Sequence, residues 1–263
     1  MKNILITGAG SGLGKLASIE LAKRGHFVYA TTHTDLQAIE LNKLCKFCNL
    51  PISTFKLDVC SSEDRNLVRN LDLDVLINNA AIGDSGSACD ISMDRYRNVF
   101  ETNVFSPLEL TQVVLNNMIT KGSGRVIFIS SLAGKSPIPF LSPYCSSKFA
   151  LEGIIPCLNK ELAYLKDVKI PIILIEPGAY STGFNQKNIS KQFIYMRNTS
   201  YFKNYYNQLK RKQFNYFRFI ESKNFYPIIN QYILAVEDQN PKKRYTAPVI
   251  QSSYIKIKTC ITN

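Results

Sequence analysis

The sequence lacks the features that would send the chain into a membrane or out of the cell. None of its apolar runs approaches the about 18 residues that a membrane-spanning helix requires, and 45% of the 263 residues are hydrophobic. A secretory signal would have a basic stretch, a longer apolar run and a cleavage site of small residues, whereas here a short apolar run gives way at once to glycines. We expect a cytoplasmic protein without a transmembrane segment. No linker-like or low-complexity stretch divides it, so one domain is predicted.

Residues that bind metals are few and poorly spaced. The two histidines, His26 and His33, do not stand at a metal-ligand spacing from Cys45 and Cys48, which form a single CxxC pair. A structural zinc ion needs four ligands, so no metal site is predicted. Seven cysteines are an odd number, and reduced thiols are the expected state in a large domain without export signals.

Acidic residues are almost absent from one segment towards the C-terminus. The whole chain has a formal net charge of +12, and residues 185–226 hold nine basic residues against the single acid Glu221, a net charge of +8. Thirteen aromatic residues lie within residues 184–226, which we call the basic aromatic segment. The nine basic residues are Lys187, Lys191, Arg197, Lys203, Lys210, Arg211, Lys212, Arg218 and Lys223.

Several interpretations of the basic aromatic segment remain open. It could be a lid that turns its aromatic residues towards an apolar substrate and its bases outward. The bases could instead steer an anionic substrate such as a CoA or carrier-protein thioester, or rest on an anionic membrane surface. Platforms for single-stranded nucleic acid also mix aromatics with bases, but no RNP-like or OB-like pattern is present. The simplest interpretation is an amphipathic pair of helices with a solvated lysine face.

The first residues have the pattern of a dinucleotide-binding turn. An apolar strand is expected over residues 2–7, followed by TGAGSGLG (Thr7 to Gly14) and by a helix that stops at Gly25. Small residues let the backbone approach a pyrophosphate, while the helix N-terminus offers free N–H groups and the positive end of its dipole.

Strand-like and helix-like segments then alternate along the chain. This alternation predicts an α/β fold, a doubly wound parallel sheet of Rossmann-like type with helices on both faces and right-handed crossovers. Further strands are expected over residues 26–32, 51–59, 74–78, 124–130, 169–182 and 244–251. Helices are expected over residues 35–48, 61–70, 92–104, 107–121 and 144–165.

The end of the second strand bears on the choice of cofactor. In a dinucleotide fold this position faces the adenosine ribose, and an acidic side chain there repels the 2′-phosphate of NADP. Thr31, Thr32 and His33 carry no negative charge, although Asp35 is near. His33 could meet the 2′-phosphate or could be a solvated turn residue. NADP(H) is therefore slightly preferred over NAD(H).

Tyr144 and Lys148 have the spacing of a proton-transfer pair. They stand four residues apart, so in a helix their side chains share one face about one turn apart. A nearby ammonium favours the phenolate and is expected to lower the pKa of Tyr144 towards the range of general acid–base catalysis. Ser131 follows the strand-like run thirteen residues upstream, and its hydroxyl can bond a carbonyl or alcohol oxygen.

Six motifs, in matching order and spacing, resemble those of the short-chain dehydrogenase/reductase family. The resemblance covers about residues 1–182 and reaches residues 244–251 more weakly. YCSSKFALEG and the VYAT strand look most similar to the hydroxysteroid, retinol and carbonyl reductase branches. The motifs are TGAGSGLG (7–14), LDV (57–59), NNAA (78–81), ETNVFSP around Asn103, Ser131 with YCSSK (144–148), and PGAYST (177–182).

The resemblance implies a role for each matched residue. Tyr144 would exchange the proton, Ser131 would orient the substrate oxygen, and Lys148 would lower the tyrosine pKa and hold the nicotinamide ribose. Asn103 would position a water in a proton relay to Lys148. The residues expected to bind the cofactor are Gly8, Ser11, Gly12, Leu13, Gly14, His33, Asp58, Val59, Asn79, Ala80, Tyr144, Lys148, Pro177, Gly178 and Thr182.

The resulting hypothesis is an NAD(P)(H)-dependent oxidoreductase that interconverts a secondary alcohol and a ketone or aldehyde. Its expected substrate is an apolar carbonyl compound, and residues 183–226 are expected to form the substrate-binding lobe. A 3-oxoacyl thioester reductase is one alternative, and a nucleotide-binding regulatory protein is another. The intact set of Asn103, Ser131, Tyr144 and Lys148 argues against the regulatory protein, which has no chemical need of all four. The family implies a homodimer or homotetramer, and no nucleic-acid partner is expected.

Overall fold

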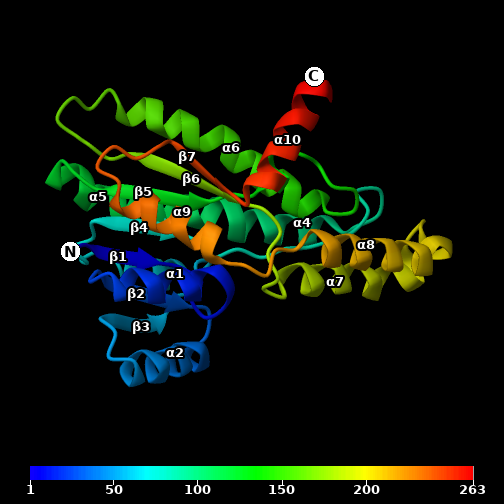
Figure 1. Ribbon diagram of the computed structural model, residues 1–263, viewed down its shortest axis with the longest axis horizontal. Coiled ribbons are helices and arrows are strands. Elements are labelled where there is room, and N and C mark those ends of the chain that lie inside the picture. Colours follow the sequence, from blue (N-terminus) through cyan, green and yellow to red (C-terminus); the bar gives the residue numbers. More distant parts are fainter. Residues whose placement is uncertain (263) are drawn as a thin grey trace.

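A computed structural model describes residues 1–262, with side chains up to Ile257. Its centre is a parallel sheet of seven strands in the order β3-β2-β1-β4-β5-β6-β7, with helices on both faces (Figure 1). This arrangement confirms the predicted doubly wound Rossmann-like fold. The strands are β1 (Asn3–Ile6), β2 (Phe27–Thr32), β3 (Ile52–Lys56), β4 (Val75–Asn78), β5 (Arg125–Ile129), β6 (Ile172–Pro177) and β7 (Arg244–Ala247).

Helical segments lie between consecutive strands, because parallel strands need a crossover connection. Two short helical turns and one π-helical turn, labelled η, lie among them. The helices are α1 (Gly12–Lys23), α2 (Asp35–Phe47), α3 (Ser62–Asn66), α4 (Met93–Phe100), η1 (Glu101–Phe105), α5 (Ser106–Lys121), η2 (Leu132–Gly134), α6 (Ser142–Leu162), α7 (Phe184–Thr199), η3 (Lys203–Tyr205), α8 (Tyr206–Ile220), α9 (Tyr226–Glu237) and α10 (Val249–Thr262).

Alternate residues of the central strands enter two separate hydrophobic cores. Ile4 and Ile6 of β1 belong to the core that contains α1, α2 and α9, whereas Leu5 belongs to the core that contains α5 and α6. All three side chains are fully buried. A strand covered on both faces is apolar throughout, because successive side chains point to opposite faces. This is why the central strands read as unbroken apolar runs in the sequence.

Several predicted elements are longer than the observed ones. The strand expected over 51–59 ends at Lys56, because the Asp58 backbone N–H donates to the Asp64 side chain instead of a neighbouring strand. The helix expected over 61–70 ends at Asn66, and residues 67–70 form turns. The helix expected over 92–104 is α-helical only to Phe100, beyond which a π-helical turn leads directly into α5.

The basic aromatic segment contains α7 and α8, which pack on one another at one end of the molecule (Figure 1). A third hydrophobic cluster joins these helices to the start of α6, through Cys145, Ile189, Phe193 and Phe217 among others. The two ends of the segment are tied together, since Tyr180 and Ser222 form a parallel β-bridge. The Ser181 N–H donates to the Ser222 carbonyl, and the Ser222 N–H donates to the Ala179 carbonyl.

No helix among the described residues is long and apolar enough to cross a membrane. The six cysteines whose side chains are described are free thiols, with Cys45 buried and Cys48 exposed. Cys260, the seventh, lies outside the described side chains.

Candidate active site

The predicted site residues gather at one edge of the sheet. Gly8, Asn79, Ser131 and Gly178 come directly after β1, β4, β5 and β6 or within two residues of their ends. Because the strands are parallel, their carboxyl ends share an edge, and this edge is where open α/β sheets bind ligands. The motifs that are far apart in the sequence are therefore brought together by the fold.

The turn after β1 is shaped to admit an anionic group. A Cβ at Gly8 would lie 2.8 Å from the Ala80 Cα, and Gly8 has a φ of +67° that favours glycine. A Cβ at Gly14 would overlap the Asn79 Nδ2. Helix α1 starts at Gly12, and the Ser11 side chain forms no capping hydrogen bond with it. The first N–H groups of α1 are left for an external acceptor, so the residues present fit a dinucleotide pyrophosphate.

Asn79 holds this turn in place through its side chain. Its Nδ2 donates to the carbonyls of Thr7 at 2.8 Å and Gly8 at 3.3 Å, and its Oδ1 accepts from the Tyr232 hydroxyl at 2.9 Å. The Thr7 Oγ1 accepts from the backbone N–H groups of Asn79 and Ala80, both at 3.0 Å. The predicted cofactor residues Asn79 and Ala80 thus fix the glycine turn against the loop after β4.

His33 and Asp58 lie together where β2 and β3 end. The His33 Nδ1 is 3.7 Å from the Asp58 Oδ1, and the His33 side chain is 72% exposed. Asp58 also accepts from the Cys60 N–H at 3.0 Å, while the next residue, Val59, is buried. The structure therefore places at the expected adenosine end one exposed imidazole and a carboxylate from the neighbouring strand.

The loop after β6 closes the other side of the site. Thr182 lies across from Gly12, since a Cβ at Gly12 would come 3.6 Å from the Thr182 Cβ. Gly178 donates its N–H to the Ala247 carbonyl of β7 at 2.8 Å. Gln251 of α10 accepts from the Ala179 N–H at 2.8 Å and donates to the Ile220 carbonyl at 2.7 Å. Helix α10 thereby supports the Pro177–Gly178 turn from outside.

Tyr144 and Lys148 share one face of α6, as predicted. The Lys148 Nζ lies 5.7 Å from the centre of the Tyr144 ring and donates to the Ile129 carbonyl at 2.8 Å. The Ser131 Oγ accepts from the Ala133 N–H at 3.1 Å and donates to the Pro177 carbonyl at 3.3 Å. The chain therefore brings a phenol, an ammonium and a hydroxyl to one place.

The expected lowering of the Tyr144 pKa is wrong for the chain by itself. Burial raises the pKa of Tyr144 to about 12, and a hydrogen bond with Ser131 opposes this rise only in part. Burial also lowers the pKa of Lys148 to about 8, against the attraction of Glu152. The sequence shows the pair and its spacing but not its enclosure, and desolvation disfavours the charged forms of both groups. At neutral pH the phenol is protonated and the lysine still carries its charge.

Asn103 lies in the π-helical turn η1, between α4 and α5. Its Oδ1 accepts from the Ile82 N–H and its Nδ2 donates to the Ile82 carbonyl, both at 2.9 Å. Nδ2 also donates to the Ser147 Oγ of α6 at 3.0 Å. Asn103 is 2% exposed, so it joins the loop after β4 to the helix that bears Tyr144. Single π turns inside helices are frequent at functional sites.

Comparison with known proteins identifies the family. The profile described as short chain dehydrogenase matches residues 2–192. The chain belongs to the short-chain dehydrogenase/reductase family. It is 34% identical over 215 residues to the uncharacterized oxidoreductase YusZ of Bacillus subtilis, covering 79% of this chain and 75% of that protein. It is 31% identical over 194 residues to retinol dehydrogenase 8 of Bos taurus, covering 71% of this chain and 61% of the bovine protein.

A solved structure shows the same fold over nearly the whole length. The short-chain dehydrogenase/reductase from Burkholderia phymatum in complex with NAD matches with a TM-score of 0.82 and 17% identity, covering 97% of this chain and 92% of that chain. The family and the fitted glycine turn together make this chain an NAD(P)-dependent oxidoreductase.

A buried ion network lies next to Ser131 in this short-chain dehydrogenase/reductase. Glu176 of β6 is fully buried and accepts from the Lys135 Nζ at 2.6 Å and from Arg244. Arg244 of β7 also donates to Glu152 of α6, whose other oxygen accepts from the Ser130 Oγ at 2.6 Å. The network holds both ends of the turn that carries Ser131, because Ser130 and Lys135 flank that turn.

Three residues that support the site of this short-chain dehydrogenase/reductase are not among those predicted from the sequence. Thr7 and Tyr232 fix the glycine turn, and Ser147 holds Asn103. Thr7 and Ser147 stand within the quoted motifs, so their positions could have marked them. Tyr232 lies on α9, 153 residues from its partner Asn79, and no local pattern connects the two.

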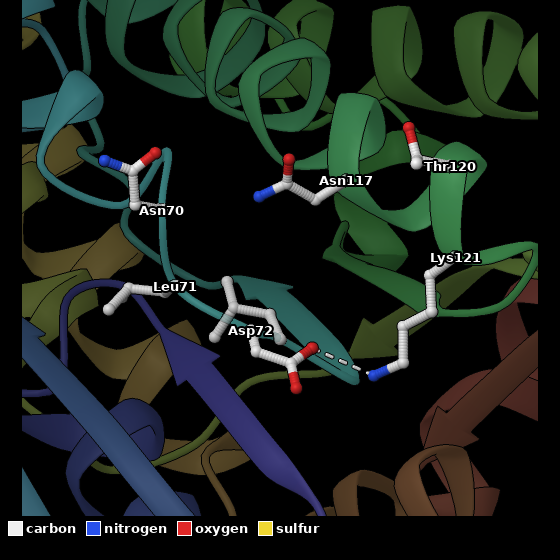
Figure 2. Close-up of a pocket in the computed structure, with 7 residues that line it drawn as sticks. Asn70, Leu71, Asp72, Asn117, Thr120 and Lys121 are labelled. Atoms are coloured by element: carbon white, nitrogen blue, oxygen red, sulfur yellow. Dashed lines mark hydrogen bonds and ion pairs between the residues drawn. The ribbon is translucent and has the colours of Figure 1, made fainter.

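A pocket at the opposite edge of the sheet is separate from this chemistry. It is lined by residues 70–73, which precede β4, and by Asn117, Thr120 and Lys121 near the end of α5 (Figure 2). The Lys121 Nζ pairs with Asp72 at 3.0 Å, and the Asp72 side chain is 76% exposed. Exposed ion pairs of this kind contribute little to stability. The strands present their amino ends at this edge, so this pocket is not the active site.

Proposed function

We propose that this oxidoreductase interconverts an apolar secondary alcohol and the corresponding ketone, or an aldehyde, with NADP(H) slightly preferred over NAD(H). One observation carries the proposal: the Tyr144 phenol, grouped with Ser131 and Lys148, borders the aromatic side of the basic aromatic segment. The Phe184 ring at the start of α7 lies 5.6 Å from the Tyr144 ring. Tyr144 also packs against the cluster that contains Ile189 and Phe193. An apolar substrate would find hydrocarbon on one side of the phenol.

The nicotinamide supplies or accepts the hydride when the dinucleotide is bound. The protein's residues orient the substrate and move the proton. The hydrogen bond that the Ser131 hydroxyl donates to the Pro177 carbonyl is 3.3 Å long, so the hydroxyl can turn to donate to a substrate oxygen. Tyr144 then donates its proton to that oxygen during reduction, and takes it back during oxidation. Lys148 stabilises the phenolate through its charge, from a position fixed by the Ile129 carbonyl.

The substrate class is supported by the surroundings of Tyr144 and by one relative. Ligand pockets are mostly apolar with a few placed polar groups, and Phe184 with its neighbours gives this composition around the phenol. One similar protein is named a retinol dehydrogenase, and retinol is an apolar alcohol. Residues 183–226 are accordingly proposed as the substrate-binding lobe.

The cofactor preference is supported by the end of β2. No carboxylate stands at residues 31–33, and a ring nitrogen of the exposed His33 can donate a hydrogen bond to a 2′-phosphate. The ratio of kcat/KM with NADPH to that with NADH tests the preference, in the wild type and in His33→Ala. We expect a ratio above one that falls in the variant. A large preference of the wild type for NADH would reverse the proposal.

Substitution of Tyr144 tests the proton donor. We expect Tyr144→Phe to lower kcat by about 10²–10⁴-fold while the dissociation constant for NADPH stays within about twofold, because the hydroxyl is the only atom lost. Tyr164→Phe is the matched control, since that tyrosine is 86% exposed and outside the site. Turnover of Tyr144→Phe at the wild-type rate would exclude Tyr144 as the donor.

The assembly and location of the protein stay predictions. The expected homodimer or homotetramer is tested by light scattering during size-exclusion chromatography. The expected cytoplasmic location is tested by fractionating cells that produce the protein.

A further inference from the structure

Helix α8 presents an exposed apolar and basic face. Lys212, Tyr216 and Phe219 have the spacing i, i+4 and i+7, which places them on one face of the helix. Phe219 is 90% exposed and Tyr216 is 47% exposed. Arg211 and Arg218 flank this face and are also exposed. The opposite side of α8 is buried through Phe217, so the exposed face is not required to hold the lobe together.

Helix α10 presents a second exposed apolar face. Ile250, Tyr254 and Ile257 have the same i, i+4 and i+7 spacing and are 84%, 64% and 61% exposed. Isolated apolar side chains on a surface are ordinary, whereas large contiguous patches mark interaction sites. Three consecutive positions of one helical face are a pattern rather than an isolated side chain.

The two faces adjoin where α10 begins. Gln251 donates from its Nε2 to the carbonyl of Ile220, the last residue of α8, at 2.7 Å. The pKa of Tyr216 is raised by burial and, to a smaller extent, by the charge of Tyr254. The two tyrosines are therefore close enough for an electrostatic interaction. Figure 1 shows α8 and α10 diverging from this junction, away from α2. We call Arg211, Lys212, Tyr216, Arg218, Phe219, Ile250, Tyr254 and Ile257 the α8–α10 surface.

The charge of this surface indicates what it binds. Among the residues that the structure describes, Arg211, Lys212 and Arg218 form no ion pair. The one acid of the segment, Glu221, accepts from Asn185 and Gln186 instead. A second copy of the chain would bring an equal positive charge against these bases. A partner of negative charge is favoured, and it must also accept apolar side chains.

We propose that the α8–α10 surface binds an anionic lipid bilayer. Exposed aromatic and aliphatic side chains enter the boundary between headgroups and acyl chains, while lysine and arginine side chains pair with anionic headgroups. Single-stranded nucleic acid is disfavoured, because bases stack on aromatic rings and Ile250 and Ile257 have none. The proposal does not rest on the proposed substrate, since none of these residues touches the catalytic group.

Sedimentation with lipid vesicles tests the proposal. The full-length protein is mixed with vesicles of phosphatidylcholine alone, or with about a third of phosphatidylserine, at low and high salt. We expect binding to the anionic vesicles that weakens with salt, because salt screens the exposed bases. The double variant Arg211→Gln/Lys212→Gln should bind about 30-fold more weakly, at about 1 kcal/mol for each base near the bilayer. Phe219→Ser/Ile250→Ser should bind at least tenfold more weakly.

Helix α2 supplies matched controls. Phe47 is 90% exposed there, and Lys43 and Lys46 are exposed on the same helix. Lys43→Gln/Lys46→Gln and Phe47→Ser should bind vesicles like the wild type. All variants should keep the wild-type circular dichroism spectrum, because every changed side chain is exposed. They should also keep the wild-type dissociation constant for NADPH, because none of the changed residues is among those expected to bind the cofactor.

Four results would overturn the proposal. These are equal binding to neutral and anionic vesicles, wild-type binding by either α8–α10 double variant, equal losses in the α2 variants, and no binding to either vesicle. Binding of single-stranded nucleic acid or self-association, each lost in the α8–α10 variants while vesicles are not bound, would assign the surface to that partner. Vesicle binding by a wild-type protein that shows no turnover of any carbonyl compound would count against the enzyme assignment alone.

Discussion

Replacement of Lys148 by methionine should make the folded protein more stable while removing its activity. The Lys148 side chain is 2% exposed, and its enclosure lowers its pKa from 10.5 to about 8. At about 1.4 kcal/mol for each pKa unit, keeping the ammonium charged in the fold costs about 3 kcal/mol at pH 7. Methionine keeps most of the side chain's length but carries no charge. It also loses the hydrogen bond to the Ile129 carbonyl, and this loss offsets about 1 kcal/mol of the gained stability. The net gain is about 2 kcal/mol.

The pH dependence of this gain identifies its cause. The folded-state pKa lies below that of the unfolded chain, so the unfolded chain binds more protons between about pH 8 and 10.5. The free energy of unfolding of the wild type therefore rises with pH in this window, and the Lys148→Met variant lacks that rise. The stability difference should shrink by about 2 kcal/mol between pH 7 and pH 9.5.

Urea unfolding of the purified protein without nucleotide, followed by far-ultraviolet circular dichroism, measures this difference. Because the chain has no tryptophan, the spectrum is preferable to fluorescence. Lys166→Met is the control, since Lys166 is exposed and its replacement should give a stability change that does not vary with pH. A Lys148→Met variant that is less stable than the wild type at pH 7, or a difference that stays flat up to pH 9.5, would refute the reasoning.

Three further substitutions test the supports of the site. Gly8→Ala should raise the dissociation constant for NADPH, measured by titration, at least tenfold, because the added Cβ would lie 2.8 Å from a backbone atom. Unchanged binding would contradict a role of the glycine turn in holding the nucleotide. Tyr232→Phe leaves the Asn79 Oδ1 without its donor, so chemical unfolding should show a loss of about 1–3 kcal/mol; an unchanged midpoint would show that this bond contributes little. Glu176→Gln removes the fully buried carboxylate between two cations, with an expected loss of about 3 kcal/mol and a lower kcat at unchanged nucleotide affinity, whereas an equal fall in both would indicate general unfolding.

The sequence predicted the layout of the sheet because its signals are local. Each buried strand is an unbroken apolar run, and each site motif follows such a run directly. Once the strands are parallel, their carboxyl ends must meet, so Ser131 after β5 and Asn79 after β4 come together without any long-range information. The predictions failed at element ends, where a side chain such as that of Asp64 replaces a backbone partner.

The burial of the site residues and their contacts with distant segments could not be predicted from the sequence. The spacing of Tyr144 and Lys148 shows that they are neighbours, but their pKa values depend on the burial that other elements provide. The bond from Tyr232 to Asn79 joins α9 to the loop after β4. The network around Arg244 likewise joins β7, β6 and α6. Such contacts depend on tertiary packing, which no pattern within one segment encodes.

The β-bridge between Tyr180 and Ser222 has a consequence for how such an enzyme can change. Because the chain leaves the sheet region and returns to it at nearly the same point, residues 183–221 form an excursion whose ends meet. A shorter or longer piece could be spliced in there without altering the register of any strand. The closing entropy of such an insert grows slowly with its length. Under the proposed function, substrate range can thus diverge by exchange of this one segment, while the glycine turn and the group of Ser131, Tyr144 and Lys148 remain as they are.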